Sequence, residues 1–341
     1  MKAYRYKYVA ILITTLIATC IYFFSKPEDK YFRISSVVWT TEYHITYKGN
    51  CDITDSINRV FNAIDNTLSV FNPKSTISRI NANDPTVKPH PYVTDLISRS
   101  IAINRQSEGY YDPTVAPLVN LWGFGTKKES AIPTKEQINE ALQYVGINNV
   151  KIDDKGNVVK QHKQTIINLS SIAKGFACDE IGRMFLRNGI DNYIIEIGGE
   201  ICMHGANPQG EEWHVSIDRP IESNDSVIHE SAIVLRLTNK GLATSGNYRN
   251  YREMNGKTFS HIINPTTGYP ENSDVLSATI IASNTADADA YATACIAMGA
   301  ERSMRMIQAD KDICALLIYV DKHGEIKNWL SHDLRQMIVK Q

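Results

Sequence analysis

The sequence lacks paired cysteines. None of its six cysteines stands in a C-x-x-C pair, which excludes a zinc ribbon and a thioredoxin-type motif. It also has no basic tail or stripe, and the formal net charge is only -1, so nucleic acid is not an expected partner. No repeat, low-complexity tract or long linker divides the chain. The 341 residues, 43% of them hydrophobic, are enough for a sizeable core in one domain or two fused lobes.

The N-terminus departs from this even composition. Lys2, Arg5 and Lys7 precede an uncharged run from Tyr8 to Ser25, which Lys26 closes. At about 1.5 Å per residue, a helix of this length spans roughly 27 Å, barely enough to cross a bilayer. The basic flank should remain in the cytoplasm, so the rest of the chain should face outward. The run therefore predicts a tether to the inner membrane, with the chain on the periplasmic or extracytoplasmic side.

Three interpretations of this run remain open. It can be an uncleaved signal anchor. It can be a lipoprotein signal, because Ile17-Ala18-Thr19-Cys20 resembles a lipobox, although the residue before the cysteine is atypical. It can also be a buried core helix. We favour the first two, and therefore expect a signal anchor or lipoprotein signal over residues 1–25, a spacer over 26–34, and a folded domain over 35–341.

The pattern of apolar residues predicts an α+β fold. Runs of β-branched and aromatic residues alternate with helical patterns, but without the regular βαβ rhythm of a doubly wound sheet. We therefore expect mixed or antiparallel sheets with inserted helices. An apolar segment rich in Pro and Gly, residues 109–125, is expected to be irregular but ordered, as segments that line sites often are. The main expected helices are one capped by Asp52 or Thr54 that runs to about Leu68, one over 93–107, one capped by Ser170 or Ser171 that runs to about Asn188, and one capped by Asn284 or Thr285 that runs through Met298. The main expected strands are 34–47, 193–197, 275–282 and 313–320.

The segment Asn168-Leu169-Ser170-Ser171-Ile172-Ala173-Lys174-Gly175 is a candidate phosphate site. It runs from the end of an expected strand into the start of an expected helix. Free N–H groups and the helix dipole favour an anion there, and the serine hydroxyls and Lys174 would add donors and a positive charge. The alternative is an ordinary helix capped by serine, with a lysine on its surface.

The turn Gly198-Gly199-Glu200 follows an expected buried strand. Paired glycines let the backbone approach a flat or charged ligand closely, although a simple turn has the same sequence. The pattern is not the G-x-G-x-x-G fingerprint, so it does not support a dinucleotide-binding Rossmann domain.

Two short polar segments, Thr244 to Arg249 and His261 to Gly268, gather serine, asparagine, tyrosine, arginine and histidine. A histidine titrates near neutral pH, so His261 could act as a general base toward a hydroxyl nucleophile. The alternative is a histidine that only forms structural hydrogen bonds.

The segment Asp287 to Thr293 is a candidate metal site. Residues four apart share one face of a helix, so Asp289 and Thr293 present a carboxylate and a hydroxyl together. Both are hard oxygen ligands, suited to an Mg²⁺ ion that also binds substrate phosphates. Asp287 shares its face with Tyr291, a poorer ligand, and better fits an acid that caps the helix.

Taken together, these segments resemble the FAD:protein FMN transferase family, also called ApbE. The resemblance spans nearly the whole chain after residue 35, and the segments come in the family's order. The matching stretches are Thr41-x-Tyr43-x-Ile45, Leu68-Ser69-Val70-Phe71, Tyr111-Asp112 through Leu121-Trp122-Gly123-Phe124-Gly125, Leu169 to Gly175, Gly198-Gly199, Thr244 to Tyr251, His261 to Gly268 and Ala288 to Thr293.

The resemblance implies FAD bound in a cleft between two lobes, with Mg²⁺ at the diphosphate. Asp289 and Thr293 match the family's metal ligands, and a backbone carbonyl of the turn after Ser170, taken as that of Ser171, is the expected third. His261 matches a residue proposed to activate the acceptor hydroxyl. The positions that match the family's FAD contacts are Val70, Phe71, Asn72, Gly109, Tyr110, Tyr111, Ser170, Ala173, Lys174 and Ile263.

The implied activity is transfer of FMN from FAD to a threonine or serine of an acceptor flavoprotein subunit of a membrane redox complex, with release of AMP. Two alternatives remain open: an Mg²⁺-dependent FAD pyrophosphatase with water as the acceptor, and a non-enzymatic FAD-binding lipoprotein. The sequence departs from the family at Trp39-Thr40, where the family has Met-Gly, and at Asn168 and Asn264, where it has aspartate. These changes leave the expected metal ligands in place.

Overall fold

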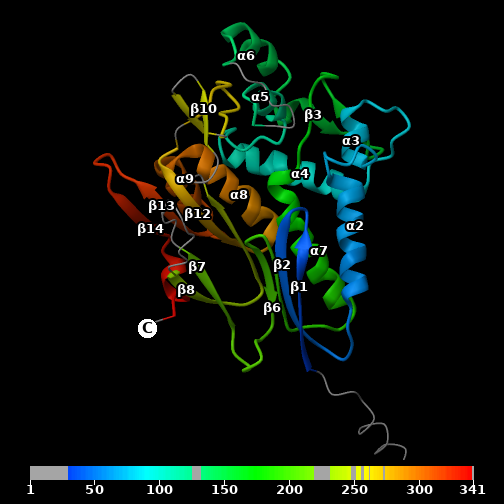
Figure 1. Ribbon diagram of the computed structural model, residues 1–341, viewed down its shortest axis with the longest axis vertical. Helices are drawn as coiled ribbons and strands as arrows, with labels where there is room; N and C mark the ends of the chain where they lie inside the picture. Colours follow the sequence, from blue (N-terminus) through cyan, green and yellow to red (C-terminus); the bar gives the residue numbers. More distant parts are fainter. Residues whose placement is uncertain are drawn as a thin grey trace, which may run out of the picture.

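The computed structural model describes residues 30–124, 132–218, 231–246, 251–254, 257–260, 262–271 and 273–339. An eight-stranded sheet runs through the molecule in the order β1-β2-β5-β6-β9-β12-β13-β14 (Figure 1). Every neighbouring pair is antiparallel. Its strands are β1 (Lys30–Val38), β2 (Thr41–Gly49), β5 (Tyr193–Ile197), β6 (Glu200–His204), β9 (Lys240–Gly246), β12 (Val275–Ala282), β13 (Cys314–Val320) and β14 (Ile326–Leu330).

Three two-stranded hairpins and a set of helices complete the described chain. The hairpins are β3 (Val150–Ile152) with β4 (Val158–Lys160), β7 (Trp213–Asp218) with β8 (Ser231–Leu237), and β10 (Tyr251–Met254) with β11 (Lys257–Ser260). The helices are α2 (Thr54–Leu68), α3 (Thr76–Asn81), α4 (Pro91–Gln106), α5 (Ala116–Leu121), α6 (Lys135–Leu142), α7 (Ser170–Arg187), α8 (Thr285–Met298) and α9 (Ala300–Ala309), with 3-10 turns η1 (Ile147–Asn149) and η2 (Asp333–Met337). The predicted α+β class with antiparallel sheets and inserted helices is confirmed, whereas the two-lobe arrangement stays a prediction.

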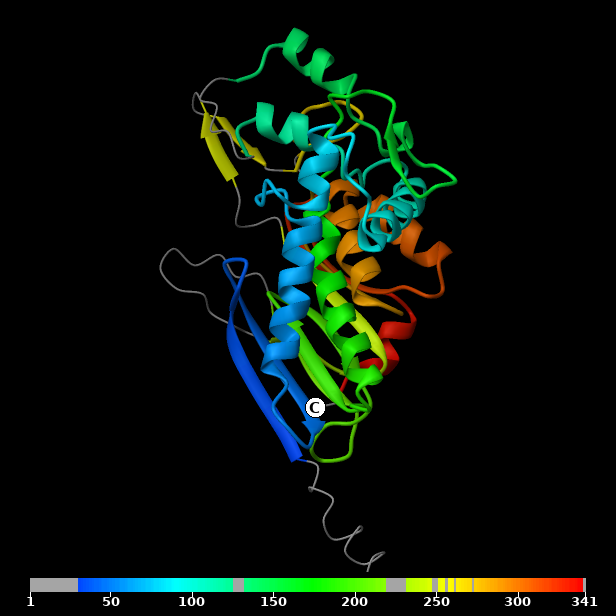
Figure 2. The same cartoon turned by 90° about the vertical axis from the view of Figure 1, so that its right-hand side faces the viewer.

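The middle of the large sheet, at β9 and β12, is buried on both faces. Successive residues of a strand point to opposite faces, and here Ala243 and Ile280 pack into the main core while Leu242 and Ile281 pack into a second one. The main core lies between the sheet and the long helices, among which α2 and α7 run side by side (Figure 2). The second core is closed by the hairpin β7–β8, through residues such as Trp213. The sheet therefore forms a rigid support for α7 and α8.

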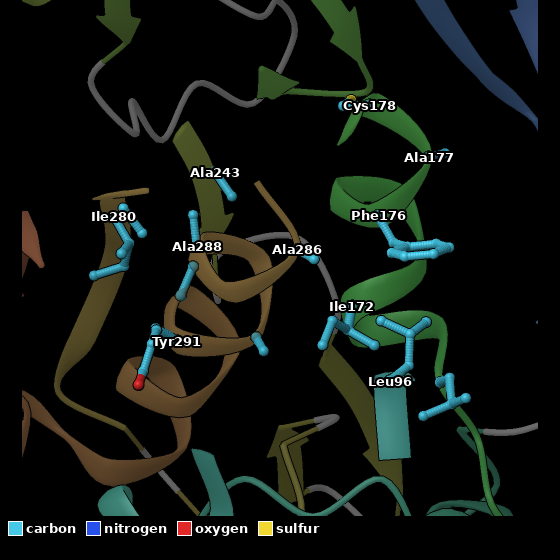
Figure 3. Close-up of a cluster of buried hydrophobic side chains, with 14 of the residues drawn as sticks. Leu96, Ile172, Phe176, Ala177, Cys178, Ala243, Ile280, Ala286, Ala288 and Tyr291 are labelled. Atoms are coloured by element: carbon cyan, nitrogen blue, oxygen red, sulfur yellow. The ribbon is translucent and has the colours of Figure 1, made fainter. Parts of the chain in front are cut away.

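Helix α8 is buried on nearly every side. Its alanines are all buried, with Ala286 and Ala288 no more than 1% exposed, and small side chains allow helix α7 to approach closely (Figure 3). Asn284 caps the helix by accepting a hydrogen bond from the N–H of Asp287, and Gly299, with φ of 78°, ends it. From α7, Asp179 accepts two further hydrogen bonds of 2.9 Å, from the N–H groups of residues 285 and 286. These contacts fix the first turn of α8 against α7.

Three local features differ from the expectations. Strand β1 begins at Lys30, so residues 30–34 of the expected spacer pair with β2. The segment 109–125 contains the short helix α5, because Pro117 is tolerated in a first turn, where its missing N–H has no helical partner anyway. Helix α7 begins at Ser170 without a serine cap, and Asn168 accepts the hydrogen bond from the Ser170 N–H instead, at 3.0 Å.

The described residues contain no helix long and apolar enough to span a bilayer. The expected tether, residues 1–25, lies outside the residues that the structure describes.

Candidate active site

A cavity of about 270 Å³ opens beside the first turns of α7. Five of the segments singled out in the sequence meet there, although they lie far apart along the chain. The lining residues are Ser170, Ser171, Lys174, Glu200, Thr244, Ser245, Gly246, Ile262, Asp289, Thr293 and Ile296.

The N-terminus of α7 forms one wall. Asn168 Oδ1 accepts hydrogen bonds from the N–H and the Oγ of Ser170, at 3.0 and 2.6 Å. Ser171 Oγ donates to the hydroxyl of Tyr111 at 3.2 Å. Tyr111 is buried, and this burial raises its pKa, so its hydroxyl stays protonated. Tyr111 therefore supports the wall from behind through Ser171.

Lys174 and Glu200 form an ion pair at the cavity. Lys174 Nζ bonds Glu200 Oε1, and Glu200 is only 3% exposed. Burial, followed by the negative charge of Asp289, raises the pKa of Glu200 to about 8, while Lys174 opposes the rise. Burial alone would lower the pKa of Lys174, but Glu200 and Asp289 outweigh it and the pKa is raised. Lys174 therefore stays positively charged in the cavity.

Asp289 and Thr293 line the cavity from α8. The carboxylate of Asp289 is 4% exposed and accepts a hydrogen bond of 3.1 Å from the N–H of Gly175. Burial raises its pKa, against the opposing effects of Lys174 and of this hydrogen bond. Asp287 instead forms a 3.0 Å ion pair with Arg99 and is not part of the cavity lining. Asp287 and Asp289, although only two residues apart, therefore lie in different surroundings.

Glu200 is a lining residue for which sequence reasoning gave no role. In the sequence, Glu200 stands out only as the last residue of the turn that begins with Gly198-Gly199. The signal that could have identified it is an acid directly after a glycine pair, at the end of a buried strand. Such a position places a charged side chain at the start of the interior strand β6, close to Lys174 of α7.

Several expected FAD contacts lie outside the cavity lining. Phe71 is 75% exposed, and Val70 packs against the main core. Asn72, in the turn after α2, donates a 3.0 Å hydrogen bond to Asp65 of that helix. Gly109 has φ of +85° and precedes Tyr110, whose ring lies 5.0 Å from the guanidinium carbon of Arg302. Their roles as FAD contacts stay predictions.

The remaining expected site residues have varied positions. Ala173 is half-buried against the main core. Ile263 is buried with Leu118 in a third small core, and its neighbour Ile262 lines the cavity instead. His261 lies outside the described residues, as do the Asn247 to Arg249 positions. Their roles stay predictions.

The cavity fits a divalent cation better than a bare diphosphate. When ionised, Asp289 and Glu200 bring two negative charges against the one positive charge of Lys174, so an anion alone would be repelled. Among the described residues, no three His, Cys, Asp or Glu side chains cluster as a complete metal site. Mg²⁺ does not require one, since it is usually held by one or two carboxylates together with substrate phosphates and water. The Asp289 carboxylate, the Thr293 hydroxyl and the backbone carbonyl of Ser171 form such a set of oxygen ligands.

Gly175 allows α7 and α8 to pack around this site. A methyl group there would lie 2.3 Å from the carbonyl oxygen of Thr285 and 2.9 Å from Cβ of Asp289. We expect Gly175→Ala to lower the free energy of unfolding by about 1–3 kcal/mol, as overpacking does, measured by urea denaturation. Leu186→Ala, at a 42% exposed position of the same helix, should change it less. A stabilised Gly175→Ala variant, which helix propensity alone would give, would contradict the packing argument.

Comparisons with known proteins agree with the sequence resemblance. The sequence model of the ApbE family matches residues 39–317. The FAD:protein FMN transferase of Vibrio cholerae is 34% identical, with 97% of this chain and 98% of that protein covered. The FAD:protein FMN transferase of Haemophilus influenzae is 32% identical, with 92% of each covered.

Solved structures give the same result. The flavin transferase ApbE from Vibrio cholerae superposes with a TM-score of 0.79 at 30% identity, covering 91% of this chain and 99% of that one. The apo form of the Pseudomonas stutzeri flavinyl transferase ApbE gives a TM-score of 0.79 at 25% identity, covering 91% and 97%. The family model and these relatives cover most of the chain, and the chain therefore belongs to the ApbE family.

Proposed function

We propose that this chain is an Mg²⁺-dependent transferase that moves FMN from FAD to a threonine or serine hydroxyl of another protein. The observation that carries the proposal is the cavity in which Asp289, Thr293, Ser171 and Lys174 meet. It unites a carboxylate, hydroxyls, an ammonium and the N-terminus of α7 in a chain whose curated relatives are named FAD:protein FMN transferases. These groups suit a diphosphate bound with a cation.

The reaction balances without a further reactant. The acceptor oxygen forms a bond to the phosphorus of the FMN half, and the bond from that phosphorus to the AMP phosphate breaks. The products are an FMN phosphoester on the acceptor and AMP, and the hydroxyl proton passes to a base, for which His261 is the proposed residue. Lys174 would hold phosphate oxygens in this geometry.

Mg²⁺, when bound, supplies positive charge that offsets the charge developing on the diphosphate. Asp289, Thr293 and the backbone carbonyl of Ser171 are the groups that would hold it. These three groups would hold the cation on the same wall as Lys174. Two positively charged groups, the cation and the Lys174 ammonium, would then act on one diphosphate.

The proposal is tested by mixing the chain with FAD, Mg²⁺ and candidate acceptor proteins. Intact mass spectrometry should show an added FMN group on the acceptor, and removal of Mg²⁺ with EDTA should abolish the addition. Rapid release of FMN and AMP without any acceptor would instead support the FAD pyrophosphatase. FAD that is bound but unchanged in every mixture would support a non-enzymatic binding protein.

The proposal extends to location and partner. We place the chain at the inner membrane on its periplasmic or extracytoplasmic side, because a basic flank precedes the uncharged run from Tyr8 to Ser25. The acceptor would then be a flavoprotein subunit of a membrane redox complex that exposes its threonine or serine on the same side.

The tether can be tested by fractionation. The full chain should sediment with membranes, and a chain that starts at Lys30, the first residue of β1, should remain soluble. A diacylglyceryl mass on Cys20 would identify a lipoprotein, whereas an unprocessed N-terminus would identify a signal anchor. Full-length chain found in the soluble fraction would contradict both forms of the tether.

A further inference from the structure

Glu200 has one carboxylate oxygen that is buried without a partner. Its Oε1 bonds Lys174 Nζ, but Oε2 has no hydrogen-bond partner among the residues that the structure describes. Leaving a buried acceptor unsatisfied is unfavourable, and more so when it is charged. Such an atom in a native structure calls for an explanation, and a bound water or ion is one that fits a position in a cavity. The position of Glu200 in the cavity lining makes this oxygen an indication of what the cavity binds.

The charges around Glu200 favour a cation. Asp289 and Glu200 are both lining residues, and Lys174 is the one positively charged side chain among the described lining residues. The other polar lining side chains are serine and threonine hydroxyls. A hydroxyl could satisfy the hydrogen bond of Oε2, but it would leave the excess negative charge uncompensated when both carboxylates are ionised.

Lys174 does not supply the missing charge once phosphate enters. Its side chain is 36% exposed, whereas that of Glu200 is 4% exposed, so the ammonium can turn toward a phosphate while the carboxylate stays in place. Glu200 then needs a second positive partner, and a divalent cation close to Asp289 provides it.

We propose that Glu200 is a further ligand of the divalent cation, bound to it directly or through one water molecule, and that the cavity binds this cation before FAD. The proposal rests on the proposed function in that it places a divalent cation at Asp289. It adds a second carboxylate from β6 to the ligands on α7 and α8. The cation site then joins the sheet to both helices.

The experiment is a titration of the purified full chain with manganese(II) chloride in the absence of FAD, followed by the EPR signal of free Mn²⁺. Mn²⁺ prefers the same carboxylate, carbonyl and water oxygens as Mg²⁺. We expect the unmodified chain to bind Mn²⁺, and Glu200→Gln to bind it about 10–100-fold more weakly, the range typical when a supporting group of a metal site is removed. Equal affinity in the two, or no Mn²⁺ binding by the unmodified chain without FAD, would overturn the proposal.

A matched pair of variants separates contact with the cation from an effect on Lys174. Glu200→Gln also releases the Lys174 ammonium, which could repel Mn²⁺ by itself. The comparison is therefore repeated in a Lys174→Met background. A loss of affinity that persists there supports the contact, and a loss that disappears shows that Glu200 only neutralises Lys174, which would overturn the proposal.

Two features keep the result interpretable. If Glu200→Gln does not fold, Glu200→Asp keeps the charge but withdraws it by one methylene, and unchanged Mn²⁺ affinity in that variant counts equally against the proposal. The Mn²⁺ titration uses no FAD and no acceptor, and it measures no turnover. Failure of FMN transfer in the mass assay would therefore leave this result standing, and the reverse also holds.

Discussion

An Asp289→Asn variant is expected to transfer FMN at least about a hundredfold more slowly than the unmodified chain, the scale seen when one electrostatic contact to the transition state is lost. The change removes the negative charge, but the amide oxygen can still accept the hydrogen bond from Gly175. The fold of α7 against α8 should therefore be preserved while cation binding is lost. Initial rates of FMN addition at saturating FAD and Mg²⁺, followed by mass spectrometry, give the measurement.

Asp287→Asn is the matched control. It removes the same charge two residues away, where Asp287 pairs with Arg99 on α4 rather than facing the cavity. A partly exposed pair of this kind contributes little, roughly 0–1 kcal/mol, to stability, and transfer should change by only a small factor. Thermal unfolding of both variants checks that neither effect is a loss of fold. Equal losses of transfer in the two variants would mean that the metal face of α8 has been misassigned.

A His261→Ala variant is expected to lower transfer by about 10²–10⁴-fold, the usual contribution of a positioned base. The hydroxyl of threonine or serine is a weak nucleophile near neutral pH, so its proton must be taken as the new bond forms. FAD affinity should change little, because the base contacts the acceptor rather than the cofactor. The two quantities are separated by measuring FAD binding and single-turnover transfer on the same preparation.

A second substitution distinguishes proton transfer from a hydrogen bond. Glutamine can form a hydrogen bond but cannot take up a proton near neutral pH, so His261→Gln should be as slow as His261→Ala if the histidine is the base. Much activity retained in His261→Gln would assign the imidazole a hydrogen-bonding role. Weak FAD binding in His261→Ala, with normal turnover at saturating FAD, would make His261 a cofactor ligand instead.

Local patterns in the sequence were enough to predict the elements that carry the site. The helix predicted to follow a cap at Asn284 or Thr285 and to run through Met298 is observed as Thr285–Met298, because Asn284 is a good cap and Gly299 a good stop. The spacing of four residues put Asp289 and Thr293 on one face, and both line the cavity. The phosphate-site segment likewise begins a helix, but at Ser170 itself rather than after a serine cap.

What the sequence could not provide depends on contacts between distant segments. Glu200 lies beside Lys174 only because β6 and α7 meet, and no spacing along the chain encodes that approach. The need for glycine at position 175 depends on the carbonyl of Thr285, more than a hundred residues later. The short helix α6 was missed although Thr134 and Gln137 form a capping box, since eight residues give too little periodicity to outweigh their polar neighbours.

The burial of α8 bears on how the site moves. A helix enclosed on nearly every side cannot fray locally, and its amide protons should exchange with solvent only when the domain as a whole unfolds. Asp289 and Thr293 are therefore held in position by the same cooperative unit that holds the sheet together. The side chains of Asp289 and Thr293 therefore lose their conformational entropy during folding and not when a cation binds. The rearrangements that admit FAD and release AMP must then take place in other parts of the chain, while α8 remains the fixed reference against which they move.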